Sequence, residues 1–214
     1  MISAIVPAKA LDQAKGRLAA ILSEDERREL ALAMLEDVVR ALHDAPSIDD
    51  LRVVSPDDEV LTLAADLGAI AAKEPPNIRG INQALDYTFG QIEPPPEVLV
   101  VVLADVPLLE PNHIENAVAA LPDGRGVVIC PSEDKGTSLL AIRPPGVIPF
   151  RFGPRSSVLH RREAAALKVP CEVLPLPKLL RDIDTPDDLR ALAAEGGDGA
   201  THRLLERLRI LERA

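Results

Sequence analysis

The stretch Glu97-Val-Leu-Val-Val-Val-Leu-Ala-Asp105 decides the fold of this 214-residue chain. Its aliphatic and mostly β-branched residues form a continuous apolar run, which is typical of a strand buried on both faces of a parallel sheet. In open α/β sheets, ligands bind beyond the carboxyl ends of the strands. Because the run stops at a carboxylate, Asp105 is predicted to lie at a binding site.

The rest of the chain alternates strand-like and helix-like segments. Further strands are predicted at residues 2–6, 51–55, 69–72, 127–130, 138–143 and 172–176. Helices are predicted to begin near residues 23, 56, 81, 111, 156, 185 and 201. This alternation predicts right-handed crossovers and one three-layer α/β/α domain over residues 1–214, with a mostly parallel sheet. Residues 195–200, which are rich in glycine, are predicted to be a flexible joint before the last helix.

Composition limits the classes of partner. A net charge of -10 disfavours nucleic acid and anionic membranes, and 2% aromatic residues leave few side chains on which bases stack. A small anionic substrate stays open, because a metal ion can bridge acidic side chains to phosphate. Cys130 and Cys171 lie in apolar strand-like surroundings, and neither signal-peptide nor membrane-spanning patterns are found. We therefore expect a cytoplasmic protein with reduced thiols.

A second acidic site is Asp182-Ile-Asp184. Residues two apart in an extended segment share a face, roughly 7 Å apart, so both carboxylates point one way and Ile183 points into the core. Oxygen ligands of this kind suit Mg²⁺. The alternative is helix capping, since acidic residues often precede helices.

One comparison within the chain bears on that alternative. Ser55-Pro-Asp-Asp58 matches the predicted cap Thr185-Pro-Asp-Asp188, and both would place proline at the first helical position. No Asp-x-Asp precedes the first of these segments. Capping therefore accounts for Thr185 and the acids that follow it, and metal binding is the better prediction for Asp182, Asp184 and Asp105.

Three cations follow the first strand: Lys9, Lys15 and Arg17. The loop at this place commonly holds phosphates, which lysine binds as a point charge and arginine as a bidentate fork. A solvated basic loop is the alternative. The chain has no G-x-x-x-x-G-K-[ST] and no G-x-G-x-x-G, so neither a P-loop nor a dinucleotide fingerprint is present.

Two later segments offer polar groups to an anion or a nucleotide. Gly153 precedes a predicted helix whose N-terminus could present free N–H groups, and Ser156 could add its hydroxyl or simply cap that helix. Gly136-Thr137 by itself indicates only a turn. Asn82, after Gly80, could contact a base or sugar edge, or be an N-cap. His160 and the arginines that follow it are expected to be solvated.

Together these segments resemble the guanylyltransferases of coenzyme F420 biosynthesis, which act on 2-phospho-L-lactate or phosphoenolpyruvate. The resemblance covers almost the whole chain and rests on Val6-Pro-Ala-Lys9, Ala14-Lys15-Gly-Arg17-Leu18, Gly80-Ile-Asn82-Gln-Ala84, Leu103-Ala-Asp105-Val-Pro107, Gly136-Thr137, Phe152-Gly153-Pro-Arg-Ser156-Ser157 and Asp182-Ile-Asp184-Thr-Pro186. The Phe-Gly-Pro-x-Ser-Ser and Asp-x-Asp-Thr-Pro segments are its specific parts.

The resemblance implies a nucleotidyltransferase fold of the glycosyltransferase-A type and a Mg²⁺-dependent transfer of GMP from GTP. It implies that Asp105, Asp182 and Asp184 hold Mg²⁺, and that Thr137, Gly153 and Ser156 hold the phosphorylated acid. Lys9, Lys15 and Arg17 would neutralise the triphosphate, with Gly80, Asn82 and Asp105 also at the nucleotide. Alanines replace the glycine-rich signature that many sugar-nucleotide relatives carry in the first loop, so guanine selection stays unassigned.

Other classes compete with this prediction. A haloacid-dehalogenase phosphatase also uses Asp-x-Asp, but near the N-terminus and followed by x-Thr, whereas Pro186 stands here. Another nucleotidyltransferase or a glycosyltransferase of the same fold, acting on molybdopterin or a sugar phosphate, stays open, as does a binding domain without activity. The leucines of the last helix (Leu204, Leu205, Leu208, Leu211) favour core over a homodimer surface.

Overall fold

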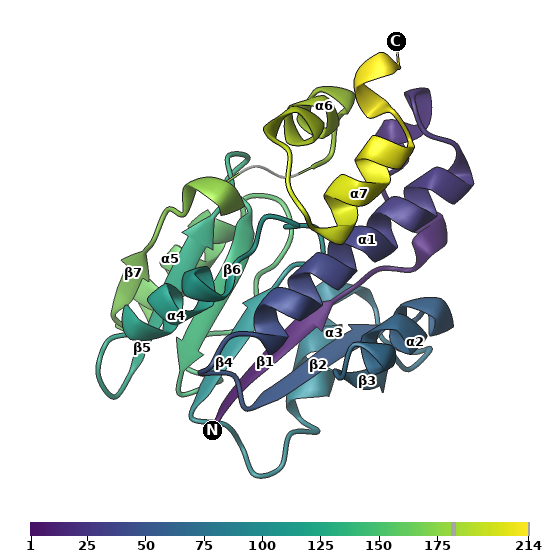
Figure 1. Cartoon of the computed structure of the whole chain (residues 1–214). Helices are drawn as coiled ribbons and strands as arrows, with labels where there is room; N and C mark the ends of the chain where they lie inside the picture. The colour runs from purple at the N-terminus through teal and green to yellow at the C-terminus, as the bar shows by residue number, and fades with distance from the viewer. Residues whose placement is uncertain (181–182, 214) are drawn as a thin grey trace.

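The computed structural model describes residues 1–180 and 183–213. Within them, one seven-stranded sheet has the order β3-β2-β1-β4-β6-β5-β7 (Figure 1). The strands are β1 Ile2–Pro7, β2 Asp50–Ser55, β3 Ile70–Lys73, β4 Val98–Val102, β5 Gly126–Pro131, β6 Thr137–Arg143 and β7 Cys171–Val173. Parallel pairing joins β3, β2, β1 and β4, and also β5 and β7, which confirms the mostly parallel sheet.

Strand β6 runs against both of its neighbours, β4 and β5. The reason is the connection before it, because only a short polar turn separates Pro131 from Thr137. A turn of this length joins antiparallel strands, whereas a parallel pair needs a long crossover. The expectation of crossovers between parallel strands was therefore wrong at this connection. It was also wrong between β6 and β7, since β7 is parallel to β5 and therefore runs against β6.

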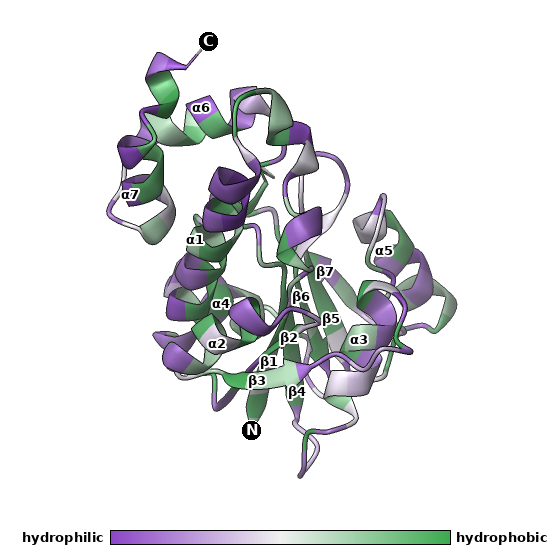
Figure 2. Ribbon diagram, turned by 90° about the vertical axis from the view of Figure 1, so that its right-hand side faces the viewer, coloured by the Kyte–Doolittle hydropathy of each residue, from purple (hydrophilic) through white to green (hydrophobic). Residues whose placement is uncertain are grey.

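Helices cover both faces of the sheet and give the predicted three layers (Figure 2). On one face lie α1 (Glu24–His43), α2 (Asp58–Asp66) and α4 (Pro111–Ala119), and on the other α3 (Gly80–Phe89) and α5 (Ser156–Ala166). In β4, Val98, Val100 and Val102 join the first core, while Leu99 and Val101 join the second. This confirms that the apolar run is buried on both faces, where each fully buried aliphatic side chain contributes about 1.5–3 kcal/mol.

The first loop contains two short 3₁₀ helices that the sequence did not predict, η1 (Leu11–Gln13) and η2 (Gly16–Ala20). The loop is attached to the start of α2, because the Asp57 carboxylate accepts a hydrogen bond from the Leu11 N–H at 3.0 Å. Between the two turns, Lys15 has a left-handed backbone with φ 49°. This conformation is uncommon for a residue with a side chain and directs Lys15 into the fold.

The predicted match between two helix caps was wrong. The N-cap of α2 is Asp57, which accepts from the Glu59 N–H, while Ser55 and Pro56 precede the helix. In contrast, Thr185 is the N-cap of α6 (Pro186–Glu195) and forms a capping box with Asp188. The two segments have similar sequences but cap their helices differently. Their comparison therefore does not support metal binding by Asp184.

The chain ends in a helical layer packed on α1. After η3 (Pro177–Leu179) come α6, α7 (Ala200–Arg207) and η4 (Ile210–Glu212). The last helix was predicted to run from Thr201 to Arg213, but it ends at Arg207, and Arg209 then turns left-handed with φ 50°. Leu204 and Leu205 are buried as expected for core, whereas Leu211 is 61% exposed. A flexible joint at 195–200 stays a prediction, although the Asp37 carboxylate accepts from the N–H groups of Ala200 and Thr201.

A small hydrophobic cluster, here called the C-terminal cluster, lies under this layer. It contains Leu18, Leu22, Leu30, Met34, Ile183, Leu189, Leu192, Leu204, Leu205 and Ile210. Ile183 is 1% exposed, which confirms that it points into the core. The cluster therefore joins the first loop to the segment that carries Asp184.

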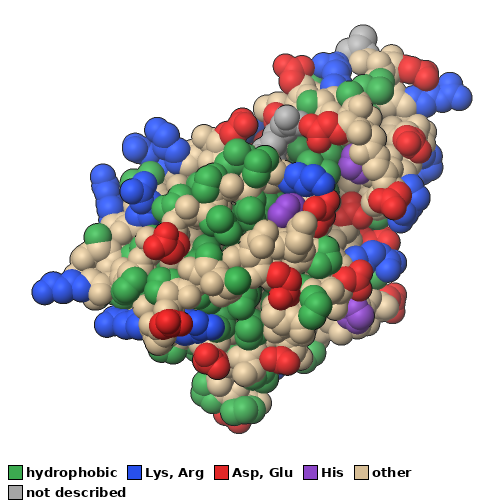
Figure 3. Space-filling model, turned by 60° about the vertical axis from the view of Figure 1, so that its left-hand side comes forward, with side chains coloured by type: hydrophobic (Ala, Val, Ile, Leu, Met, Phe, Trp, Pro, Cys, Tyr) green, Lys and Arg blue, Asp and Glu red, His purple; other side chains and the backbone are tan. Residues whose placement is uncertain are grey.

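Charged side chains of both signs are interspersed over the face shown in Figure 3. The two cysteines are free thiols, Cys130 buried and Cys171 partly so. Among the described helices, no segment combines the length and the apolar character needed to cross a membrane.

The pair of Glu26 and Arg213 predicts how stability depends on pH. The hydrogen bonds from Arg213, with those from Ser23, lower the pKa of Glu26 to about 2. Stability from this depressed pKa is fully present above about 4.5 and is lost as pH falls toward 2. We expect Glu26→Gln to lower the thermal midpoint at pH 7 and to match the wild type near pH 2. Glu24→Gln, in the same helical turn and exposed, is the control, and a difference between Glu26→Gln and the wild type that did not change with pH would contradict the expectation.

Candidate active site

A cleft of about 800 Å³ opens at the carboxyl ends of β1, β2 and β4. Its volume lies in the range of cavities that bind small molecules and cofactors. The structure brings most of the predicted site residues to this one cleft, although they come from segments far apart in the chain. Those that line it are Lys9, Lys15, Gly80, Asp105, Thr137, Gly153, Ser156 and Asp184.

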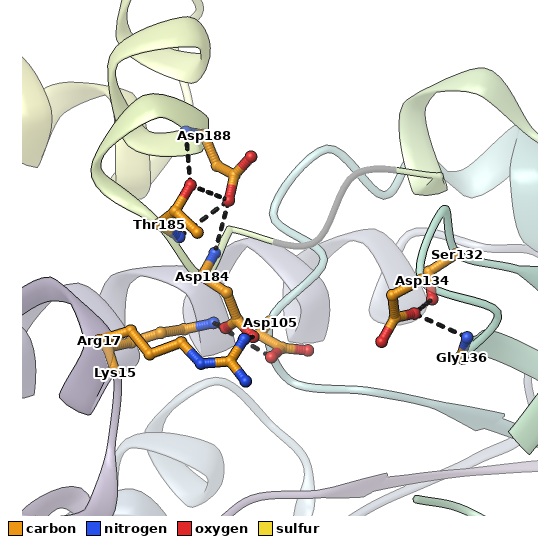
Figure 4. Close-up of polar contacts among 9 residues, drawn as sticks. All are labelled: Lys15, Arg17, Asp105, Ser132, Asp134, Gly136, Asp184, Thr185 and Asp188. Atoms are coloured by element: carbon orange, nitrogen blue, oxygen red, sulfur yellow. Dashed lines mark hydrogen bonds and ion pairs between the residues drawn. The ribbon is translucent and has the colours of Figure 1, made fainter. Parts of the chain in front are cut away.

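At one end of the cleft, a lysine lies between two carboxylates (Figure 4). The Lys15 Nζ is 3.1 Å from Asp105 Oδ2 and 3.2 Å from Asp184 Oδ1. The Lys15 side chain is only 7% exposed, against 37% and 43% for the two aspartates. Burial acts to lower the pKa of Lys15, but the two carboxylates outweigh it and raise the pKa above its usual 10.5. The ammonium is therefore charged at neutral pH.

Local structure places the two carboxylates. Asp105 lies just beyond Val102, the last residue of β4, at the strand end where a binding site was predicted. Asp184 directly precedes the cap of α6, and its N–H, like that of Thr185, donates to Asp188 Oδ2. Figure 4 shows Thr185 and Asp188 behind Asp184, on the side away from Lys15. Asp182 lies outside the described residues, so its predicted metal contact stays a prediction.

The other two cations of the first loop lie further out. Arg17 is 77% exposed, with its guanidinium 3.5 Å from Asp184 Oδ2, and it does not line the cleft. Lys9 is exposed, lines the cleft, and has no ion-pair partner among residues 1–180 and 183–213. The three cations thus lie at different depths, Lys15 buried and Lys9 and Arg17 exposed.

Two of the described carboxylates are suited to bind a divalent cation. No group of three or more His, Cys, Asp or Glu side chains gathers for metal binding within the described ranges. Asp105 and Asp184 nevertheless offer hard oxygen donors, and the Lys15 ammonium already stands in as the cation between them. The donor chemistry therefore fits a metal such as Mg²⁺.

The opposite end of the cleft presents uncharged donors. The Ser156 hydroxyl donates to Thr137 Oγ1 at 3.0 Å, and both side chains are 1% exposed. Ser156 is the first residue of α5, and Arg155 is the N-cap, so of the two alternatives left open for Ser156 the capping one is wrong. The N–H groups of Ser156 and Ser157 are already bonded to the carbonyls of Gly153 and Lys135.

Gly153 lines this part of the cleft, and its backbone N–H is unbonded among the described residues. Its φ of 131° lies where only glycine is comfortable, so a larger residue is strained there even though the space is open. Within the described part of the chain, its N–H has no hydrogen-bond partner. The free N–H therefore adds a donor beside the two hydroxyls.

Asn82 has a different place from either of its two sequence interpretations. It is not an N-cap, because Arg79 holds that position in α3, and it does not line the cleft. Its amide instead accepts from the Phe152 N–H at 2.8 Å and donates to the Phe152 carbonyl at 3.0 Å. Asn82 thus holds the loop that presents Gly153, and its predicted nucleotide contact has no support from this geometry. Gly80, by contrast, does line the cleft.

Sequence reasoning missed several cleft residues, among them Glu74, Arg79, Ser132 and Asp134. Asp134 Oδ1 accepts from the Ser132 hydroxyl at 2.6 Å and from the Gly136 N–H at 2.7 Å. In Figure 4 this turn lies across from Asp105. A signal was available, because a short polar turn joins two apolar strands at the same edge of the sheet.

The sequence matches the family model described as "Guanylyl transferase CofC like" over residues 2–213. The chain belongs to this family. A phosphoenolpyruvate guanylyltransferase of Sphaerobacter thermophilus is 41% identical, covering 92% of this chain and 95% of the relative. A 2-phospho-L-lactate guanylyltransferase of Methanocaldococcus jannaschii is 31% identical, covering 96% of this chain and 88% of the relative. Membership of the CofC-like family confirms the resemblance seen in the sequence.

The fold of this family member also matches solved nucleotidyltransferases. A nucleotidyl transferase from Methanothermobacter superposes with a TM-score of 0.65 at 17% identity, covering 91% of this chain and 97% of the other. At that identity the likeness concerns the fold alone, and it confirms the predicted nucleotidyltransferase architecture.

Removal of the central ammonium tests the charge arrangement. Lys15→Met leaves Asp105 and Asp184 facing each other without a cation, so we expect a loss of about 1–2 kcal/mol in EDTA, given that both carboxylates are partly exposed. That is a fall of several degrees in the thermal midpoint. Millimolar Mg²⁺ should recover most of it. Lys9→Met should change little in either buffer, and equal shifts for the two variants would contradict the arrangement.

Proposed function

We propose that this chain is a guanylyltransferase that moves GMP from GTP to the phosphate of phosphoenolpyruvate or 2-phospho-L-lactate and releases pyrophosphate, in coenzyme F420 biosynthesis. The observation that carries the proposal is the Lys15 ammonium between Asp105 and Asp184 at one end of a cleft whose other end presents neutral donors. Family membership and the names of the two relatives support the same reaction.

The charges divide the cleft between two substrates. A triphosphate is highly charged, and Lys9, Lys15 and Arg17 supply positive charge beside the carboxylates that would hold its metal. The acid would lie at Thr137, Ser156 and Gly153, where directional hydrogen-bond donors fit carboxylate or phosphate oxygens. Gly80 lines the cleft at the start of α3 and would lie by the nucleotide.

Asp105 and Asp184, with Asp182, would hold Mg²⁺. When bound, the metal supplies positive charge that lets two phosphate anions approach each other. For Asp105 and Asp184 to hold a metal, the Lys15 ammonium would have to leave its central place, and the oxygens of a triphosphate would offer it new partners.

The reaction needs little covalent work from the protein. An oxygen of the acid's phosphate attacks the α-phosphorus of GTP, a new P–O bond forms, and the bond to the β-phosphate oxygen breaks to release pyrophosphate. The nucleophile is already ionised at pH 7, so no general base is required. The side chains therefore act by alignment and by neutralising charge.

Asp184→Asn tests the acidic site. We expect turnover to fall at least a hundredfold, while the thermal midpoint moves by only a few degrees, because Lys15 keeps Asp105 as a partner. Asp187→Asn is the matched control, since Asp187 lies in the first turn of α6 and is 95% exposed. Near-normal turnover of Asp184→Asn with Mg²⁺ would contradict the assignment.

A substrate panel tests the reaction itself. Pyrophosphate release is measured with GTP, ATP or CTP and each of phosphoenolpyruvate, 2-phospho-L-lactate, 3-phosphoglycerate and a sugar phosphate, and phosphate release is measured with a simple phosphate ester. We expect release that needs both GTP and one of the first two acids, and the panel identifies which acid is preferred. Activity with a sugar phosphate instead, or phosphate release from a simple ester, would overturn the proposal. A cytoplasmic location and a homodimer stay predictions.

A further inference from the structure

His160 is a buried titratable group that the reaction above does not use. It lies in α5 with 0% exposure, directly beneath the end of the cleft that presents neutral donors. Its Nδ1 is 3.1 Å from Thr137 Oγ1, and its Nε2 is 2.9 Å from the backbone nitrogen of Arg151. The ring therefore touches both the strand that carries Thr137 and the loop that leads to Gly153.

The partners of the ring determine its tautomer. A backbone N–H can only donate, so the bond from Arg151 requires a lone pair on Nε2. The hydrogen of a neutral imidazole must then be on Nδ1, where it points at Thr137. Burial, with the nearby Arg151 charge, lowers the pKa of His160 to about 4, so the ring is neutral at pH 7.

The tautomer determines how many hydroxyl hydrogens of Thr137 and Ser156 remain available to a ligand. Nδ1–H, the Thr137 hydroxyl and the Ser156 hydroxyl form a chain of two contacts, His160 to Thr137 and Thr137 to Ser156. With Nδ1 as a donor, one hydroxyl hydrogen is used inside the chain and the other is left for a ligand. With the opposite tautomer, both hydroxyls donate within the chain and none is left.

On its other side, the His160 ring contacts the loop that contains Phe152. Phe152 packs against His160 edge-on, with ring centroids 5.0 Å apart, and its backbone is bonded in both directions to Asn82. Gly153 follows immediately, with its free N–H. His160 thus holds together the separate segments that supply the donors.

We propose that His160 is a positioning residue that makes the Thr137–Ser156 hydroxyl pair a hydrogen-bond donor toward the anionic group of the phosphorylated acid. This inference rests on the proposed function and adds a role that acts through Thr137, since His160 itself is covered by these residues. It predicts an effect on the acid and none on GTP.

Two substitutions at His160 distinguish the roles of its two ring nitrogens. Asn places its amide nitrogen near Nδ1 and keeps a donor for Thr137, whereas Gln places its amide near Nε2 and loses that donor. We expect His160→Gln to raise the KM for the acid about tenfold or more, the size of one lost hydrogen bond to a charged group, and His160→Asn to raise it far less. The KM for GTP should stay unchanged in both variants. His202→Gln, at a buried histidine in α7 away from the cleft, is the control.

A double-mutant cycle tests whether His160 acts through Thr137. Thr137→Val keeps the shape of the side chain and removes its hydroxyl, so adding His160→Gln to it should raise the KM for the acid little further. Additive effects, an equal rise in the Asn and Gln variants, or a matching rise in the KM for GTP would overturn the inference.

Thermal unfolding is measured first for each variant. Should His160→Gln not fold, the inference requires a near wild-type KM for the acid in His160→Asn together with a raised one in Thr137→Val, and a raised value in both overturns it. A wild-type protein that releases no pyrophosphate with GTP and either acid would overturn the proposed function as well. An active wild type with indistinguishable Asn and Gln variants would overturn the role of His160 alone.

Discussion

The candidate active site depends on one interaction, the Lys15 ammonium held between the carboxylates of Asp105 and Asp184. The two carboxylates repel each other, and their repulsion grows as water is excluded from the cleft. The three side chains come from the first loop, the loop after β4 and the residue before the cap of α6. A single cation therefore holds together segments that are far apart in the chain. A left-handed backbone at Lys15 is the local cost of that arrangement.

The C-terminal cluster makes this arrangement stable. Leu18 of the first loop and Ile183 beside Asp184 are buried in the same small core, together with leucines of α6 and α7. Arg213 then closes the layer by donating to Glu26 in the first turn of α1. The last helices, which contribute no side chain that contacts Lys15, are thereby part of the active-site scaffold.

The two ends of the cleft differ in the kind of group that they offer to an anion. Around Lys15 the groups are charged, and charge acts at a distance with little demand on geometry. Around Thr137 the donors are neutral, so they act only if their hydrogens point the right way. That requirement explains why a buried neutral histidine and the Asn82 clamp lie behind these donors, whereas Lys9 and Arg17 are exposed.

The sequence by itself determined the central strand, the three layers, the burial of Ile183 and the cap at Thr185. These features depend on the periodicity of apolar residues and on the type of residue at a helix start, both of which can be read locally along the chain. It also singled out Lys15, Asp105 and Asp184 separately. Only the tertiary structure decided that Lys15 lies between the two carboxylates and that Asp57 rather than Ser55 caps α2. It also decided that Asn82 and His160 hold the segments that carry Gly153 and Thr137. The contacts of Lys15 and Asn82 join residues far apart in the chain. Asn82 and His160 bond to backbone groups of Phe152 and Arg151, which every residue has and no sequence pattern can distinguish.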